Sequence, residues 1–311
     1  MGMYRSNKNY GWGKNIKFAA KNSLRDMYGH GHFATVAAHQ ERWNQFVKFL
    51  ATMDIKDASL CTLNHIEIYA KHLIYRVENG EMAVAYAQNL LSTVNVILDA
   101  MGADKSLRIS PAKFVGKRSA IRQEAPVMST EIVLDSQQEM IGQNLIRIRS
   151  IVDLIRTFGL RSKEASLLDS KQAFKEAKSK GCVTIIKGTK GGRKRDVPIR
   201  NQDQIIALEK AATIQGNGNN LILPGLTWIQ WKNGLLREGR ETLKSNGVPG
   251  FHDQRAAYAC LRYEEITGNP APVLGCPIED YDLDKRAREI IAEELGHNRI
   301  DVTTEYLGAR R

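Results

Sequence analysis

The stretch that decides the fold is Cys182-Val-Thr-Ile-Ile-Lys-Gly-Thr-Lys-Gly-Gly-Arg-Lys-Arg-Asp-Val-Pro-Ile199. Its first part, from Cys182 to Lys187, is rich in β-branched residues, and the last part, from Arg195, is again extended in pattern. Glycines and cations occupy the positions between the two parts. The stretch therefore predicts a β-hairpin with a basic, glycine-rich tip. It does not match the P-loop pattern G-x-x-x-x-G-K-[ST].

Helices are predicted on both sides of this hairpin. Residues 145–158 place apolar side chains on one side of a helix that ends at Gly159, and helices alternate with loops from Gln202 onward. Three segments nearer the N-terminus repeat apolar residues at helical spacing: 34–50, 63–77 and 82–101. The sequence thus predicts a mainly α fold with one small β-hairpin, of the α+β class.

Helix-end signals and shifts in composition divide the chain further. Asn64 is a plausible N-cap and Gly102 a stop for the helices beside them. Lysines and aromatic residues are interleaved near the N-terminus, which favours either an arm that touches DNA or a loosely docked terminus. We predict a basic N-terminal arm at residues 1–30, a helical domain at 31–104, a basic linker at 105–129 and a domain of helices with one hairpin at 130–311.

Composition and charge narrow the function. The chain has 311 residues, with 45 Lys+Arg against 34 Asp+Glu, a net charge of +11. This balance favours a nucleic acid as partner, and the alternative is a basic enzyme without such a partner. No apolar run approaches the roughly 20 residues of a membrane span. The four cysteines are widely spaced without a C-x-x-C pair, which argues against a zinc site and a disulfide framework. We expect a cytoplasmic protein without a membrane partner.

Several short patches carry side chains suited to phosphoryl transfer. His252 and Arg255 are three residues apart and share one face of a helix, where together they suit an outward-facing phosphate site. Arg161 would complete a clamp around a phosphodiester, and the nearby cations would favour the nucleophilic phenolate of Tyr306. A lysine at the hairpin tip can protonate the leaving oxygen. The candidate catalytic residues are Arg161, Lys190, His252, Arg255, His297 and Tyr306.

Each of these residues alone has an ordinary structural explanation, such as a solvated charge or a packed aromatic ring. Their order and spacing, however, resemble the tyrosine recombinase (phage integrase) family. The matching stretches are Leu160-Arg161-Ser-Lys-Glu164, Lys190 eight residues before Pro198, His252-x-x-Arg255, and Gly296-His297 followed nine residues later by Tyr306. Lys187 is the alternative lysine, whereas Glu164 is expected to be a structural partner for a basic group.

The resemblance implies a helical core-binding domain and a catalytic domain that together clamp DNA. It further implies that Arg161 and Arg255 hold the scissile phosphate, that Lys190 protonates the departing 5′ oxygen, and that Tyr306 forms a 3′-phosphotyrosyl link. His252 would donate to the phosphate or move the proton of the nucleophile, and His297 would support the phosphate or orient Tyr306. No cofactor and no metal are expected, since arginines neutralise the phosphate.

The implied function is site-specific recombination of double-stranded DNA, for integration or excision of a mobile genetic element. The implied assembly is a dimer on each site and a tetrameric synapse, with accessory DNA-bending proteins as further partners, in the nucleoid region of the cytoplasm. The alternatives are a type IB topoisomerase-like nicking-closing enzyme and a catalytically inactive DNA-binding relative of the integrases.

Two features depart from the family pattern. The 42 residues from Arg255 to His297 are more than is usual, and residues 267–284, which carry prolines and glycines, are expected to form a surface insertion. The stretch after Tyr306 is also short, whereas many members carry a C-terminal helix there that docks on a neighbouring protomer.

Overall fold

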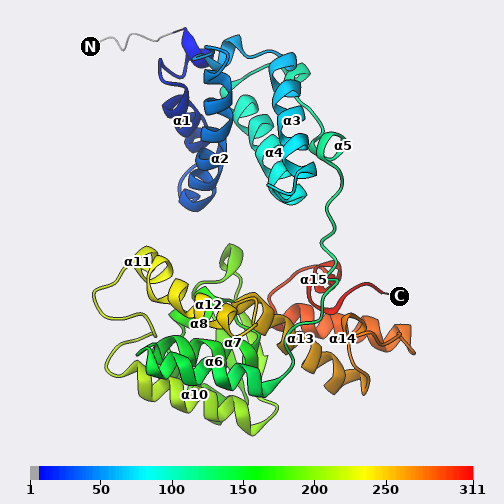
Figure 1. Ribbon diagram of the computed structural model, residues 1–311. Helices are drawn as coiled ribbons and strands as arrows, with labels where there is room; N and C mark the ends of the chain where they lie inside the picture. The colour runs from blue at the N-terminus through cyan, green and yellow to red at the C-terminus, as the bar shows by residue number, and fades with distance from the viewer. Residues whose placement is uncertain (1–6, 311) are drawn as a thin grey trace. The chain divides into compact units, whose positions relative to one another are not determined.

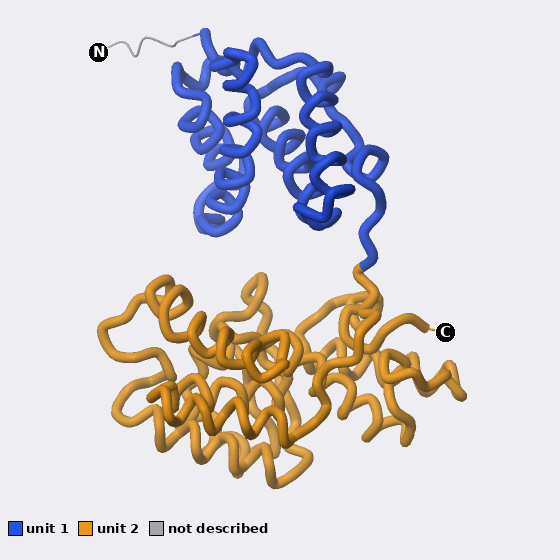
Figure 2. The backbone as a smooth tube through the Cα atoms, viewed as in Figure 1, with its two compact units in different colours: residues 1–119 blue, residues 120–311 orange. Residues whose placement is uncertain are grey.

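The computed structural model describes residues 7–310, and the chain divides into two compact units, residues 1–119 and residues 120–311 (Figure 2). The expected mainly α fold is confirmed, because the part of the chain that the structure describes has a single sheet of two strands. The same residues include no helix with the length and apolarity that a membrane crossing requires.

The first unit is built of helices around one apolar core, which includes Trp43, Phe46, Leu50 and Leu91. Its elements are η1 (Lys8–Gly11), α1 (Ile16–Tyr28), α2 (Phe33–Ala51), η2 (Ala58–Leu60), α3 (Leu63–Glu78), α4 (Val84–Met101), η3 (Lys105–Leu107) and α5 (Pro111–Val115).

The three helices predicted in this unit correspond to α2, α3 and α4. Gly102 ends α4 in the left-handed conformation, as its position indicated. The predicted N-cap of α3 was wrong by two residues. Thr62 is the cap, and its backbone N–H donates to Nδ1 of His65, which closes a capping box that the usual Ser/Thr…Glu pattern does not reveal.

Within the predicted basic arm, residues 1–30, the structure forms the helix α1 from Ile16 to Tyr28. The side chain of Asn15 accepts hydrogen bonds from the first backbone N–H groups of α1 and so begins the helix. The buried face of α1 consists of Ile16, Ala19, Ala20, Ser23 and Leu24. Because only two of these are large apolar residues, the helical period is weak in the sequence. Residues 1–6 of the predicted arm lie outside the described residues.

The predicted linker at 105–129 also begins too early. Residues 105–115 fold onto the first unit, where Ile109 and Val115 join the core. Residues 116–129 form neither helix nor strand.

The second unit places the hairpin among helices (Figure 1). Its elements are α6 (Thr130–Gly142), α7 (Ile146–Phe158), α8 (Ser162–Leu167), α9 (Ser170–Lys180), β1 (Cys182–Ile185), η4 (Lys190–Gly192), β2 (Arg195–Pro198), α10 (Gln202–Gln215), α11 (Trp228–Asn233), α12 (Leu235–Ser245), α13 (Phe251–Thr267), η5 (Pro272–Leu274), α14 (Tyr281–Glu294), η6 (Ile300–Thr303) and α15 (Thr304–Leu307). The apolar face of α7 forms the centre of one core, and α13, α14 and α15 share a second core.

The predicted hairpin is present. β1 and β2 are antiparallel, with Val183 opposite Val197 and Ile185 opposite Arg195. All four of these residues are buried, so the inward face of this small sheet contains a guanidinium among apolar side chains. The tip between the strands holds Lys190 at the start of η4.

The segment 267–284 is not merely a surface insertion. Ala271 is fully buried, and α14 begins within the segment, at Tyr281. The carboxylate of Asp284, also fully buried, accepts hydrogen bonds from Arg288 at 2.8 Å and from the hydroxyl of Tyr263 at 3.0 Å. The last residue of the segment therefore anchors α14 to α13.

Candidate active site

The first part of the site lies at the start of α13. Pro249 and Gly250 precede the helix, and Gly250 has a φ of 139°, a value that favours glycine. His252 and Arg255 follow in the first turns, and both contact Tyr306: the ring centroids of His252 and Tyr306 are 5.2 Å apart, and the guanidinium carbon of Arg255 lies 5.6 Å from the phenol ring centroid. The predicted shared face of these two residues is therefore the face that meets Tyr306.

The sequence suggested that the side chain of Arg255 points outward. In the structure it is instead buried, and the residue is only 1% exposed. Its guanidinium donates to the backbone carbonyl of Gly159, to the carbonyl of Leu295 at 2.6 Å and, through Nε, to the hydroxyl of Tyr306 at 3.2 Å. Gly159 and Leu295 each end or follow a helix, where carbonyl groups lack helical partners. Arg255 thus satisfies two helix ends and holds the phenol at the same time.

The Gly-His pair places His297 by closing α14. The backbone N–H of Gly296 donates to the carbonyl of Glu293, and that of His297 donates to the carbonyl of Ala292, both within 2.9 Å. This is the Schellman arrangement, and Gly296 has the positive φ, 69°, that it requires. The turn brings Nε2 of His297 to 3.2 Å from Arg255 and 3.3 Å from the hydroxyl of Tyr306.

The protonation state of His297 follows from its neighbours. Desolvation by burial and then the positive charges of Arg255, Arg161, Arg195 and Lys190 lower the pKa of His297 to about 3, so the imidazole is neutral at pH 7. A guanidinium can only donate, so Nε2 acts as the acceptor toward Arg255 and the ring proton lies on Nδ1. The same Nε2 faces the hydroxyl of Tyr306 and is placed to accept its proton.

Tyr306 belongs to the four-residue helix α15 and is 2% exposed. Its ring packs in the core shared by α13 and α14, and its backbone carbonyl faces the Sγ of Cys260 at 3.8 Å. The hydroxyl has Arg255 and His297 as its neighbours. The predicted nucleophile is therefore held by two of the other five predicted site residues.

The pattern L-R-x-x-E is a capping box at the start of α8. Glu164, at the third position of the helix, accepts a hydrogen bond from the backbone N–H of Arg161 at 2.7 Å and pairs with its guanidinium at 2.8 Å. The side chain of Arg161 is 24% exposed, so part of it stays accessible. Glu164 is a structural partner for basic groups, as expected.

Three guanidinium groups converge on this one carboxylate. Besides Arg161, Glu164 pairs with Arg195 at 2.7 Å and lies 3.8 Å from Arg255, and its side chain is fully buried. Burial by itself raises the pKa of Glu164, but the hydrogen bonds and charges of Arg195 and Arg161 outweigh this and lower it to about 2. The ionised carboxylate therefore fixes the positions of both predicted phosphate-binding arginines.

Lys190 lies at the exposed tip of the hairpin, and its positive charge contributes to lowering the pKa of His297. Lys187, the alternative lysine, instead lowers the pKa of the Asp169 carboxyl, which caps α9. The charge of Lys190 thus influences the pKa of a predicted site residue, whereas the charge of Lys187 influences the pKa of Asp169.

Arg195 is a residue of this site that the sequence motifs did not reveal. This buried residue donates from Nε to the backbone carbonyl of Glu294 at 2.7 Å and pairs with Glu164 through both terminal nitrogens. The signal was its register: Arg195 and Val197 alternate on one face of a strand, so the arginine had to be inward-facing and to need a buried carboxylate. Within residues 7–310 no cluster of three or more His, Cys, Asp or Glu side chains could hold a metal ion.

Comparison with known proteins finds an integrase family model and solved structures of integrases and recombinases. The family model described as Integrase matches residues 118–261, which include Arg161, Lys190, His252 and Arg255 but not His297 or Tyr306. No curated protein sequence matches the chain.

Among solved structures, a dimer of a lambda integrase fragment bound to a COC′ core site is 15% identical, with a TM-score of 0.63 and coverage of 94% of each chain. The Tn1549 transposon integrase in complex with circular intermediate DNA is 12% identical, with a TM-score of 0.59 and coverage of 93% of this chain and 94% of that one. The XerH site-specific recombinase bound to a palindromic difH substrate is 15% identical, with a TM-score of 0.56, and the match covers 97% of this chain and 81% of that one.

The arrangement of Arg255, His297 and Tyr306 is one that can support phosphoryl transfer at a tyrosine. Over residues 118–261 the chain is similar to the integrase family.

Proposed function

We propose that this protein is a site-specific DNA recombinase in which Tyr306 is the nucleophile. The observation that carries the proposal is the pair of contacts at the phenol: its hydroxyl lies 3.2 Å from Nε of Arg255 and 3.3 Å from Nε2 of His297. A hydroxyl between a guanidinium and a neutral imidazole can lose its proton to the imidazole while the guanidinium stabilises the oxyanion.

In the first step the phenolic oxygen of Tyr306 attacks the scissile phosphorus. The bond from phosphorus to the 5′ oxygen breaks, Lys190 gives that oxygen a proton, and a 3′-phosphotyrosyl bond forms. In the second step the free 5′ hydroxyl of another strand attacks this bond and releases Tyr306. One phosphodiester is lost and one is formed, so the two steps need no external source of energy.

Charge neutralisation falls to the arginines. Arg161 is partly accessible and its position is fixed by Glu164, so we assign it to the non-bridging phosphate oxygens. Arg255 is occupied by the phenol and by two carbonyls, so it acts on the attacking oxygen and on a phosphate oxygen beside it. His252, whose ring lies beside the phenol, is the further donor to the phosphate.

The proton of Tyr306 passes to His297 under the influence of the substrate. The surrounding cations hold the pKa of His297 low, as described above. A phosphodiester bound among the same cations brings a negative charge that opposes their effect and makes the imidazole a better base at the moment of attack.

The partner we propose is double-stranded DNA, contacted by both units of the chain, in keeping with the net charge of +11. The lambda integrase and XerH structures contain DNA, and lambda integrase is recorded as a dimer on a core site and as a tetramer on a Holliday junction. By analogy we propose a dimer on each site, a tetramer when two sites meet, and a role in moving a mobile element.

The test is covalent capture. Labelled duplexes with a nick, tiled over the DNA that flanks the gene, are incubated with the full chain and denatured with detergent. Wild-type protein should retain label on one or a few duplexes, because the short strand released at the nick cannot rejoin, and Tyr306→Phe should retain none. Adducts in Tyr306→Phe, or none in wild type, would refute the proposal.

A second arm separates recombination from nicking and closing. Two plasmids that carry the captured duplex should yield joined products with wild-type protein. Relaxation of supercoils without joined products would instead identify a topoisomerase-like enzyme.

A further inference from the structure

The segment that leads into the catalytic unit is fastened to the site although it has no regular secondary structure. Residues 122–128, which we call the entry segment, contact α13, α7 and α15 through backbone and side-chain hydrogen bonds. Arg156 of α7 donates to the carbonyls of Val127 at 3.1 Å and Met128 at 2.6 Å, and its pairing with Gln254 at 2.8 Å ties both to the start of α13. The entry segment is therefore held next to the helix that carries His252 and Arg255.

Asp253 is the main anchor of the entry segment. Its carboxylate is 3% exposed, and it follows His252 directly in the first turn of α13. One oxygen pairs with the guanidinium of Arg122, and the other accepts a hydrogen bond from the backbone N–H of Val127 at 2.9 Å. A buried carboxylate without such partners is strongly destabilising, so Asp253 and the entry segment depend on each other.

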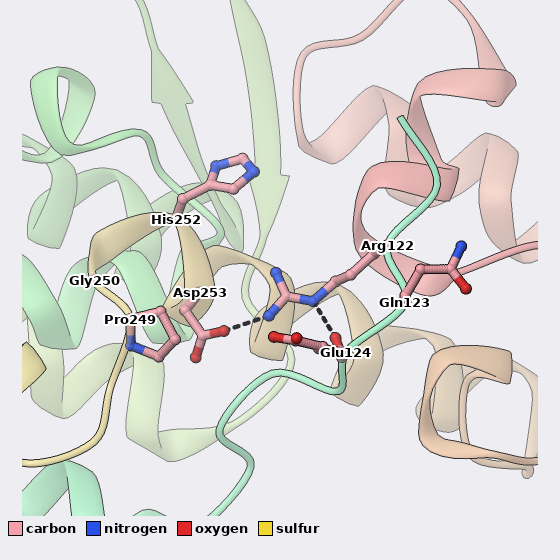
Figure 3. A pocket seen from close by; sticks show the side chains of 7 residues that line it. All are labelled: Arg122, Gln123, Glu124, Pro249, Gly250, His252 and Asp253. Carbon is pink, nitrogen blue, oxygen red and sulfur yellow. Dashed lines mark hydrogen bonds and ion pairs between the residues drawn. The ribbon is translucent and has the colours of Figure 1, made fainter. Parts of the chain in front are cut away.

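Arg122 reaches two elements of the site at once. Its guanidinium lies between the carboxylate of Asp253 and the backbone carbonyl of Glu124, the latter at 2.7 Å (Figure 3). Its backbone N–H donates at 2.9 Å to the carbonyl of Thr304, the first residue of α15 and two positions before Tyr306. One residue thus bridges the start of α13 and the helix of the nucleophile.

This bridge matters because α15 is short. The helix has four residues; Arg288 donates to the residues that flank it, Thr303 and Gly308, whereas Arg122 donates to the carbonyl of its first residue, Thr304. A small shift of the backbone at Thr304 moves the phenol relative to Arg255 and His297, and displacements of about 1 Å can cost roughly 100-fold in rate.

We propose that Arg122 is a positioning residue for DNA cleavage, which sets the distance between the nucleophile on α15 and the phosphate-binding start of α13 by bridging Thr304 and Asp253. The inference rests on the proposed function for its catalytic readout. The guanidinium of Arg122 is engaged by the carboxylate of Asp253 and the carbonyl of Glu124, whereas the guanidinium of Arg255 contacts the hydroxyl of Tyr306 itself.

The experiment compares four variants of the full chain on the duplex captured above, at saturating protein and in a single turnover. Arg122→Ala should cleave about 10- to 100-fold more slowly than wild type with unchanged affinity for the duplex. Arg122→Lys keeps a cation toward Asp253 and should recover part of the rate. Gln123→Ala changes a neighbour in the same pocket, and Arg286→Ala removes an exposed arginine of α14; both should cleave at the wild-type rate.

Hydrogen exchange supplies the readout that a general structural role would not produce. In Arg122→Ala, amides of residues 300–308 should exchange faster while those of α7 keep their wild-type protection, because the backbone of residue 122, which donates to Thr304, loses the side chain that anchors it to Asp253. Combining Arg122→Ala with Asp253→Asn should slow cleavage no more than the slower of the two single variants, since both break one bridge.

Three results would overturn the proposal. One is a normal cleavage rate and normal exchange at residues 300–308 in Arg122→Ala. Another is a rate loss that disappears when the protein concentration is raised, which would make Arg122 a DNA contact. The third is faster exchange across the whole catalytic unit. If wild-type protein forms no adduct, the proposed function fails, whereas the exchange measurement still decides whether Arg122 holds α15.

Discussion

The hydroxyl oxygen of Tyr306 lies 3.2 Å from Nε of Arg255, so the proposed nucleophile and a proposed phosphate-binding arginine are direct neighbours. The guanidinium also fixes the carbonyls of Gly159 and Leu295, which belong to two different helix ends. Arg255 therefore has a structural task besides the chemical one that we propose, whereas for Arg161, with its partly accessible side chain, the proposed chemical task is the main one.

This difference predicts a contrast between two conservative variants. Arg161→Lys should lose most of the cleavage rate but fold with wild-type stability, because lysine keeps the charge and loses only the two-pronged geometry. Arg255→Lys should lose both cleavage rate and stability. One ammonium cannot replace all the hydrogen bonds of the guanidinium, and each buried carbonyl left without a donor costs about 1–3 kcal/mol. Single-turnover cleavage and urea unfolding measure the two effects, and equal stability of the two variants would contradict the structure.

Lys190 can be tested as the general acid with an altered leaving group. Lys190→Ala should cleave ordinary DNA slowly and recover most of the rate when sulfur replaces the bridging 5′ oxygen, because a thiol, with a pKa of about 8.5, leaves without a proton. Arg161→Ala should show no recovery on the same substrate. The control is Lys187→Ala, which should cleave both substrates normally; if that variant shows the rescue instead, Lys187 is the acid.

The depressed pKa of His297 predicts how stability depends on pH. The pKa is about 3 in the folded chain against 6.5 in the unfolded chain, so below pH 6.5 the unfolded chain binds a proton that the folded one does not. This contribution to the free energy of unfolding is fully present above pH 6.5 and is lost as the pH falls toward 3. Urea unfolding of wild type and His297→Gln should therefore show a stability difference that shrinks with falling pH, and a constant difference would argue against the shift.

Gly159 and Gly181 offer a matched pair of glycine-to-alanine substitutions. It has a φ of 61°, and an added Cβ would lie 2.5 Å from the ring of Tyr258 and 2.7 Å from Leu295. Gly181 has a similar φ, 69°, at the end of α9, with open space around it. Gly181→Ala should cost about 1–2 kcal/mol from backbone strain alone, and Gly159→Ala about 1–3 kcal/mol more from overlap. Urea unfolding compares them, and equal losses would show that Tyr258 yields without cost.

The sequence predicted the parts of the site that depend on local spacing. The hairpin follows from β-branched runs around a glycine-rich turn, and the shared face of His252 and Arg255 follows from helical periodicity. The family resemblance, which depends on the order and spacing of several motifs together, supplied Tyr306 and Lys190 as candidates.

The residues that could not be predicted from the sequence are those whose partners lie far away in the chain. Arg195 needs Glu164, 31 residues earlier, and Arg122 needs Asp253, 131 residues later, so no local pattern reveals either pair. Helix α1 was missed for a different reason, because its buried face includes two alanines that carry little hydrophobic signal.

The carboxylate shared by Arg161, Arg195 and Arg255 has a consequence for the evolution of this protein. Any single substitution at Glu164 leaves the buried guanidinium groups of Arg195 and Arg255 without this carboxylate, and any single loss among the arginines changes the surroundings of the other two. The effect of a substitution at one of these four residues therefore depends on the other three. A change without loss of function must alter them together or not at all. We expect homologues of this protein to differ freely at the surfaces that recognise the DNA target, whereas these four residues change together or not at all.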